Sequence, residues 1–118
     1  MARWRCFSTS ASPPLAGLRV LELASVLAGP SVGQFFAELG ADVIKVENRK
    51  SGGDVTRSWR LKGDDPGKPS AYFACCNMGK RSLALDAKNS KGQELCRRLA
   101  ASSDVVLASY KPGDAEKL

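Results

Sequence analysis

The stretch from Gly17 to Lys50, GLRVLELASVLAGPSVGQFFAELGADVIKVENRK, constrains the fold more than any other part of the chain. It opens with a short aliphatic run, Arg19 to Leu23, which is typical of a strand buried on both faces. A second apolar run, Asp42 to Val46, follows after an interval of helical length and leads into a polar loop from Glu47. Because a helix between two strands packs back onto their sheet by a right-handed crossover, we expect the two strands to be parallel.

The interval between these runs carries the signals of a helix. Pro30 is expected at the first helical position, since its fixed φ suits a helix start and its missing N–H is not needed there. Gly40 is expected to end the helix, because glycine accepts a left-handed backbone without a Cβ penalty. The apolar residues that predict the buried face of this helix, spaced i, i+3, i+4 and i+7, are Val32, Phe35, Phe36 and Leu39.

The rest of the chain predicts two further strands, Arg81 to Leu85 and Asp104 to Ala108. Between them, Ser90 and Gln93 have the spacing of a capping box that starts a helix, and Leu95 and Leu99 would give that helix an inner face. The residues before the third strand form a long irregular segment, Asn48 to about Pro69, and then SAYFACC, which fits either a short helix or a strand. This order predicts an α/β fold with an open, doubly wound parallel sheet of Rossmann-like type.

Topology predicts where a ligand would bind. In open α/β sheets ligands occupy the crevice beyond the carboxyl ends of the strands. The start of the first helix, Ala28-Gly29-Pro30, offers free N–H groups to an anion, although a tight structural turn explains the same residues equally well. The four strand-end segments that should meet at the crevice are Ala24–Gly29, Glu47–Lys50, Leu85–Lys88 and Ser109–Gly113.

Composition excludes several classes of function. The chain has 118 residues and no histidine, which argues against zinc sites and against Ser-His or Cys-His catalysis, and we expect no metal. Its net charge of +6 is interleaved with acids and lacks an aromatic platform, so we expect no nucleic-acid partner. No apolar run approaches the roughly 18 residues of a membrane span. Neither GxGxxG nor a P-loop is present, and the four cysteines show no CxxC spacing.

The first fourteen residues, Met1 to Pro14, read MARWRCFSTSASPP and contain two arginines, several hydroxyl residues and no acid. This composition is typical of a mitochondrial transit peptide, and an ordinary disordered terminus is the alternative. We therefore expect a leader over residues 1–14, a location in the mitochondrial matrix, and a single ligand-binding domain over residues 15–118.

Five blocks of the sequence, in order, resemble the start of the class III CoA-transferases, the CaiB/BaiF family that also includes the α-methylacyl-CoA racemases. The blocks are LAGLRVLELASVLAGP, LGADVIKVE, SGGDVTRSW, NMGKRSLALD and SDVVLASYKPG. The leader together with the GDVTRSW and SAYF segments is more similar to a mitochondrial dicarboxylate CoA-transferase than to a racemase. The resemblance implies that residues 15–118 are the N-terminal, CoA-binding portion of a larger transferase fold.

The resemblance also implies which residues contact CoA or an acyl-CoA thioester. Three positions depart from the family pattern: Asn48 stands where an arginine is frequent, with Arg49 and Lys50 as possible substitutes, Ser109 replaces a frequent asparagine, and Lys117 stands for an arginine. Lysine keeps the charge but loses the bidentate fork of arginine. The expected contact residues are Leu27, Ala28, Asn48, Arg49, Leu85, Asp86, Ala87, Lys88, Ser109, Tyr110, Lys111 and Lys117.

Catalysis in the family is implied to proceed through an aspartate carboxylate that forms covalent intermediates. None of the acids Asp86, Asp104 and Asp114 matches its motif, so we assign no catalytic residue and expect this chain to be inactive alone. The implied reaction is CoA exchange between carboxylic acids such as succinate and a dicarboxylate, in a full-length homodimer. The alternatives are a CoA-binding or subunit-interaction module without catalysis, and a racemase-like fragment.

Overall fold

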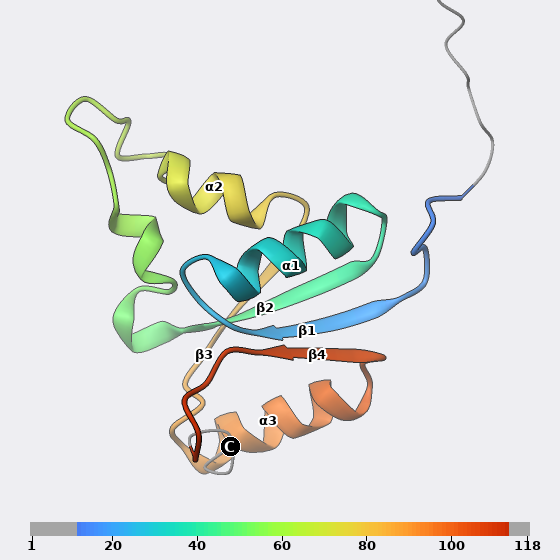
Figure 1. Cartoon of the computed structure of the whole chain (residues 1–118). Coiled ribbons are helices and arrows are strands. Elements are labelled where there is room, and N and C mark those ends of the chain that lie inside the picture. The colour runs from blue at the N-terminus through green and yellow to red at the C-terminus, as the bar shows by residue number, and fades with distance from the viewer. Residues whose placement is uncertain (1–11, 114–118) are drawn as a thin grey trace, which may run out of the picture.

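A computed structural model describes residues 12–113 and shows a four-stranded sheet in the order β3-β2-β1-β4 (Figure 1). All three strand pairings are parallel, as predicted for the first two strands. The second strand continues two residues beyond the predicted Val46, because Glu47 and Asn48 still pair with β3. The strands are β1 (Arg19–Leu23), β2 (Asp42–Asn48), β3 (Arg81–Leu85) and β4 (Val105–Ala108).

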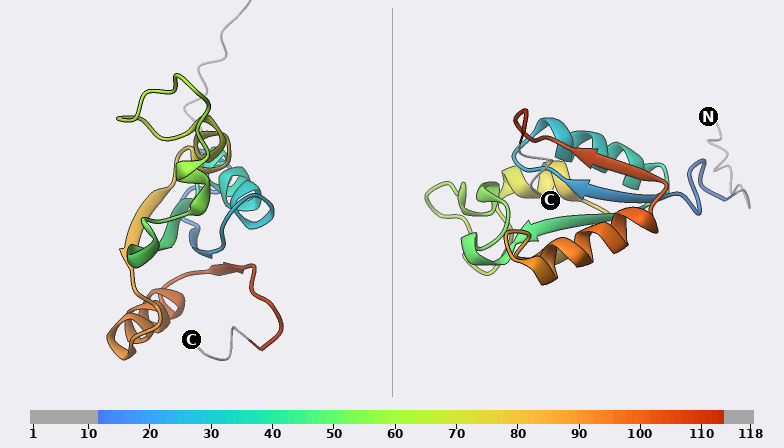
Figure 2. Two further views of the ribbon diagram at one scale, coloured as in Figure 1. Left: turned by 90° about the vertical axis from the view of Figure 1, so that its left-hand side faces the viewer. Right: turned by 90° about the horizontal axis from the view of Figure 1, so that it is seen from below.

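Helices cover both faces of the sheet, which confirms the predicted open α/β architecture. Helices α1 (Ala28–Glu38) and α2 (Ala71–Asn77) lie on one face and α3 (Ser90–Ala101) lies on the other (Figures 1 and 2). SAYFACC is therefore helical, and the Ser70 side chain caps it by accepting from the Phe73 N–H. The apolar core under α1 is built around Val20, Ala41 and Val43.

The predicted start and buried face of α1 are partly wrong. The helix begins at Ala28, so Pro30 lies in its first turn but is not its first residue. Gly40 follows the helix with φ +95°, as expected. Val32 and Phe35 are exposed, by 45% and 60%. The helix buries Pro30 and Gly33 instead, since a Cβ at residue 33 would stand 1.9 Å from Glu22 Oε2 and only glycine allows so close an approach.

The third helix also differs from its prediction. Its N-cap is Asn89, whose side chain accepts from the Gly92 N–H at 2.8 Å, so Ser90 is already helical. The buried residues of α3 are Gly92 and Cys96, whereas Leu95 is 43% exposed. A Cβ at residue 92 would meet the Asp86 carbonyl oxygen at 1.9 Å. Because only glycine fits there, the face of α3 that carries Gly92 packs against the backbone at Asp86.

The long segment between β2 and α2 contains two short 3-10 helices, Arg49–Ser51 and Val55–Ser58, and is tied to the sheet by Glu47. Arg57 donates to both carboxylate oxygens of Glu47, at 2.7 and 2.6 Å, while Ser82 Oγ and the Asp54 N–H donate at 2.6 and 2.8 Å. The Arg57 guanidinium also lies 3.7 Å from the centre of the Phe73 ring. Burial opposes the ionised form of Glu47, but these hydrogen bonds outweigh it and lower its pKa from 4.5 to about 2.

We expect Glu47→Gln to destabilise the chain by about 2–3 kcal/mol at pH 7, because a depressed pKa stores folding free energy and the substitution strands Arg57. The ionised Glu47 side chain makes its full contribution to the free energy of unfolding above pH 4.5, and this contribution is lost as the pH falls toward 2. Urea unfolding at pH 7, 4 and 3 should therefore show a difference between wild type and variant that shrinks with acidity. Glu94→Gln, a substitution at an exposed acid, is the control. If the difference in unfolding free energy between wild type and Glu47→Gln did not change with pH, the stabilising role of ionised Glu47 would be contradicted.

Candidate functional site

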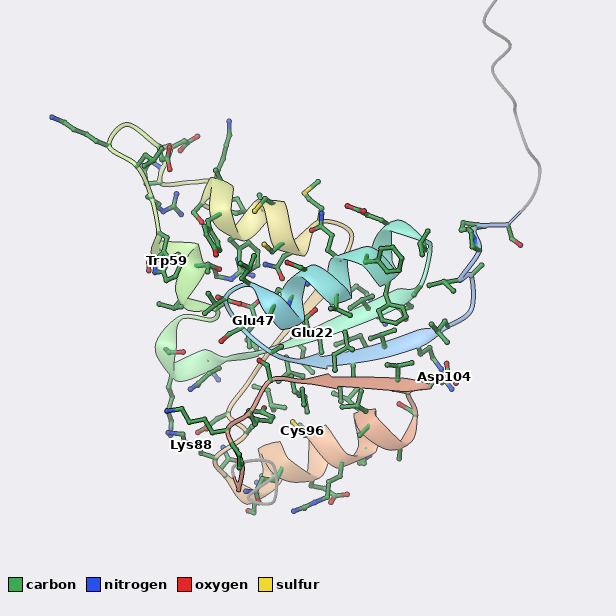
Figure 3. The ribbon with its side chains drawn as sticks, in the orientation of Figure 1. Glu22, Glu47, Trp59, Lys88, Cys96 and Asp104 are labelled. Carbon is green, nitrogen blue, oxygen red and sulfur yellow. The ribbon has the colours of Figure 1, made fainter. Side chains whose placement is uncertain are left out.

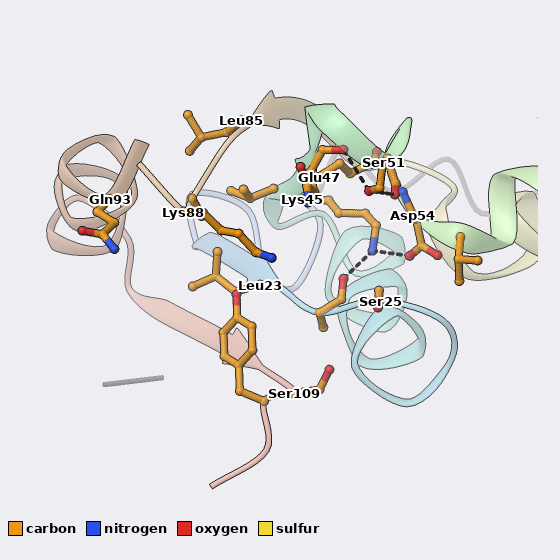
Figure 4. Close-up of a pocket in the computed structure, with 17 residues that line it drawn as sticks. Leu23, Ser25, Lys45, Glu47, Ser51, Asp54, Leu85, Lys88, Gln93 and Ser109 are labelled. Atoms are coloured by element: carbon orange, nitrogen blue, oxygen red, sulfur yellow. Dashed lines mark hydrogen bonds and ion pairs between the residues drawn. The ribbon is translucent and has the colours of Figure 1, made fainter. Parts of the chain in front are cut away.

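A pocket of about 860 Å³ lies beyond the carboxyl ends of the strands, where topology predicts a ligand site (Figure 4). Each of the four strands leads into it, and α3 contributes Gln93. The residues that line it are Leu23, Ala24, Ser25, Lys45, Val46, Glu47, Asn48, Ser51, Gly53, Asp54, Val55, Leu85, Ala87, Lys88, Gln93, Ser109 and Tyr110.

A chain of four buried charges runs under α1, and two of its members, Lys45 and Asp54, line the pocket. Lys45 Nζ lies 2.9 Å from Glu22 Oε1 and 3.0 Å from Asp54 Oδ2, and Lys80 Nζ lies 2.7 Å from Glu22 Oε2. All four side chains are at most 2% exposed. Figure 3 shows Glu22 between the sheet and α1. Two ammonium groups and two carboxylates balance one another, as burial of charge requires.

Backbone and amide oxygens complete the coordination of these ammonium groups. Lys80 Nζ donates to the Pro30 carbonyl at 2.7 Å and to Asn77 Oδ1 at 3.0 Å. Burial lowers the pKa of Lys80, and its ion pair with Glu22 opposes that shift. The Lys80 ammonium group thus ties the start of α1 and the end of α2 to Glu22 on β1.

The turn between β1 and α1 is bound to the same charges. Val26 has φ +72°, a left-handed backbone that a β-branched residue rarely adopts, at a cost of about 1–3 kcal/mol. Its N–H faces the Asp54 carboxylate, 3.2 and 3.4 Å from the two oxygens. Burial raises the pKa of Asp54, but the Thr56 N–H, Lys45 and the Thr56 hydroxyl outweigh it, so the pKa lies below its ordinary value. Asp54 therefore stays an anion.

The rim of the pocket is more exposed than its floor. Ser25, Ser51, Ser109 and Lys88 all line it with exposed side chains, and Lys88 lies across the opening in Figure 4. Tyr110 lines the wall, and burial raises the pKa of its hydroxyl, with a smaller contribution from Cys96. Such a rim offers one cation and several hydroxyl groups to an anionic ligand.

The structure brings half of the residues that the resemblance assigned to CoA into this pocket. Those that line it are Asn48, Leu85, Ala87, Lys88, Ser109 and Tyr110. Their contact with CoA remains a prediction.

The other assigned residues lie around the pocket or outside the described part. Leu27 and Ala28 are exposed at the start of α1, next to the lining turn. Arg49 lines a second, shallower hollow with Glu47 and Arg57. The remaining three are Asp86, which pairs with Lys50 at 2.8 Å, Lys111, which is exposed, and Lys117, which lies outside the described residues.

The buried polar floor was missed by reasoning from the sequence. Lys45 and Glu47 alternate with Ile44 and Val46 in β2, and a charged pair spaced i, i+2 inside an apolar strand was the signal that both point to one face. Asp54 stands in an irregular loop, and nothing local to it predicts its pairing with Lys45. In residues 12–113 there is no group of three possible metal ligands, and no helix is long and apolar enough to cross a membrane.

Comparison with known proteins agrees with this architecture. Residues 15–118 match the model of CoA-transferase family III. The chain is 50% identical over 103 residues to a succinate–glutarate CoA-transferase of Agrobacterium fabrum, covering 84% of this chain and 26% of that protein. It is 44% identical over 104 residues to a formyl-CoA:oxalate CoA-transferase of Afipia carboxidovorans, covering 88% and 24%.

Solved structures show the same fold. A CaiB/BaiF family protein from Brucella suis superposes with a TM-score of 0.82 at 50% identity, over 91% of this chain and 28% of that one. A hypothetical protein from Mycobacterium tuberculosis superposes with a TM-score of 0.79 at 38% identity, over 90% of this chain and 28% of that one. The chain thus spans about a quarter of the length of these relatives. On the family match over nearly all of its described residues, the chain belongs to CoA-transferase family III.

Proposed function

We propose that residues 15–118 are the N-terminal CoA-binding portion of a class III acyl-CoA transferase, and that the pocket at the strand ends takes the CoA part of a thioester. The observation that carries this proposal is the convergence of four strand ends on one pocket with Lys88 and hydroxyl groups at its rim. Lys88 would pair with a phosphate, and two more cations, Arg49 and Lys50, directly follow Asn48, which lines the same pocket. The apolar walls, Leu23 and Leu85 among them, suit the less polar parts of CoA.

The acyl-transferring carboxylate is, on this proposal, not among the described residues. A covalent carboxylate must be free to attack the carbonyl carbon of the acyl group. The three buried acids, Glu22, Glu47 and Asp54, are each held by at least one ion pair. Breaking such a pair would strand a buried charge, so these groups serve the structure and the pocket floor.

The proposed substrates are succinate, as its CoA thioester, and a second dicarboxylate. The name of the Agrobacterium relative, succinate–glutarate CoA-transferase, supports a dicarboxylate pair, and the oxalate transferase is a further dicarboxylate relative. These names also favour a transferase over the racemase alternative. We propose a homodimer for the full-length protein.

A second candidate, CoA binding or subunit interaction without chemistry, has one specific observation in its favour. Apolar side chains are exposed on both edge strands and on α1: Leu83 at 36%, Val106 at 45% and Phe35 at 60%. Exposed apolar surface of this kind marks a place where further protein packs. The two candidates differ in whether the full-length protein transfers CoA.

We expect the 118-residue chain to bind CoA and Lys88→Gln to weaken the affinity about 3- to 10-fold, because the variant loses one charge contact with a phosphate. Isothermal titration calorimetry at low and at high salt measures both effects, and the wild-type advantage should shrink as salt rises. Lys62→Gln, an exposed lysine outside the pocket, is the matched control. Equal affinities of wild type and Lys88→Gln would contradict the assignment of Lys88.

We expect no CoA transfer from succinyl-CoA to glutarate by the 118-residue chain, since the reaction needs a free nucleophilic carboxylate. The assay follows glutaryl-CoA by chromatography, with a full-length family III transferase as positive control. Turnover by the chain alone would show that it contains the nucleophile. Absence of turnover together with CoA binding agrees with both candidates, and activity restored by adding the rest of the protein would favour the enzyme.

Import into the mitochondrial matrix is also proposed, on the composition of residues 1–14. We expect these residues, fused to a fluorescent protein, to direct it to mitochondria, because basic, hydroxyl-rich and acid-free segments are typical of transit peptides. Microscopy with a mitochondrial marker is the measurement. Arg3→Gln with Arg5→Gln should abolish the targeting, and a diffuse signal from the unaltered fusion would overturn the proposal.

A further inference from the structure

The turn Ala24–Leu27 contributes Ala24 and Ser25 to the pocket lining and contains a strained residue. Among the non-glycine residues that the structure describes, only Val26 has a positive φ, at +72°. Branching at Cβ makes this conformation costly, on the order of tenfold in the folding equilibrium constant. Such a residue keeps its conformation only where its surroundings over-determine it.

One ion pair contacts this turn at two of its polar backbone groups. The Asp54 carboxylate accepts from the Val26 N–H at 3.2 and 3.4 Å. Lys45 Nζ donates to the Ala24 carbonyl oxygen at 2.7 Å. The two side chains meet each other at 3.0 Å, so a single cation–anion pair satisfies one donor of the turn, the Val26 N–H, and one acceptor, the Ala24 carbonyl.

Asp54 is itself held rigidly. Its Oδ1 accepts from the Thr56 N–H at 3.0 Å and from Thr56 Oγ1 at 2.8 Å, and its own N–H donates to Glu47 at 2.8 Å. Its side chain is fully buried, and the residue also lines the pocket. A carboxylate fixed from so many directions can impose a conformation on the turn it contacts.

We propose that Asp54 is a positioning residue: together with Lys45 it holds Val26 in the left-handed conformation and so places Ala24 and Ser25 at the pocket wall. The identity of the ligand in this inference rests on the CoA-binding function proposed above. The clamp, by which we mean the hold of Asp54 and Lys45 on the turn, does not depend on that function. The competing explanation is that Asp54 only neutralises Lys45. That explanation predicts no dependence on the residue at position 26.

A double-mutant cycle separates these explanations. Asp54→Asn keeps the shape of the side chain, removes its charge and turns an amide toward Lys45. Val26→Gly removes the Cβ strain, so that the left-handed conformation no longer has to be enforced. Asp65→Asn, an exposed aspartate in the same loop that caps the Gly67 N–H at 2.8 Å, is the matched control.

Two quantities are measured on the 118-residue chain and its variants: the folding equilibrium constant from urea unfolding, and the Kd for CoA at a temperature where each variant is folded. With valine at position 26, Asp54→Asn should weaken CoA binding about tenfold or more, because the turn relaxes away from its bound shape. In the Val26→Gly background the same substitution should cost about threefold or less. The factor by which Asp54→Asn lowers the folding equilibrium constant should likewise be about tenfold smaller with glycine at position 26 than with valine there.

Additive losses in both folding and affinity would overturn the proposal, because they would mean that Asp54 acts independently of the strained turn. Absence of CoA binding by the wild-type chain would overturn the proposed function instead, and the folding cycle alone would then decide the clamp. If Asp54→Asn does not fold, Thr56→Val takes its place in the cycle, since it removes one hydrogen bond to the same carboxylate. A coupling of the same sign, but smaller, is expected from it.

Discussion

The ion pair of Glu22 with Lys45 is the interaction on which the rest of the structure depends. The two residues are direct partners in the register of β1 with β2, and their side chains meet at 2.9 Å with almost no exposure to water. A slip by one residue would send the two charges to opposite faces of the sheet, which desolvation makes prohibitive. Hydrophobic burial would tolerate more than one arrangement, whereas this buried pair tolerates one.

From that pair the charge pattern extends outward to the elements that form the pocket. Lys80 joins Glu22 to the start of α1 and the end of α2, and Asp54 joins Lys45 to the loop after β2. Glu47, two residues along β2 from Lys45, holds the same loop through Arg57. The pocket is thus shaped by electrostatic contacts between segments that hydrophobic patterning alone would leave free to move.

The sequence predicted the strands, their parallel direction and the edge of the sheet at which the pocket opens, because aliphatic runs and crossover handedness are local or topological properties. It failed where small residues decide the packing. Helix periodicity favoured Val32 and Phe35, but Gly33 faces the sheet since a carboxylate lies beneath it. Likewise, the places of Lys88 and Ser109 in the pocket could be predicted because both residues follow the end of a strand. The pairing of Asp54 with Lys45 could not, because it depends on the path of an irregular loop that no local sequence pattern predicts.

Gly33 has a consequence for how this part of the molecule can vary. The spacing between α1 and β1 is set there by a carboxylate oxygen, which unlike a methyl group cannot be displaced without losing two ammonium partners. A side chain at position 33 therefore requires a shorter residue at position 22. A shorter residue at position 22 would leave the buried ammonium groups of Lys45 and Lys80 without their ion pairs to Glu22. Positions 22, 33, 45 and 80 form one unit of substitution, spread over two strands, a helix and a loop, that can change together or not at all.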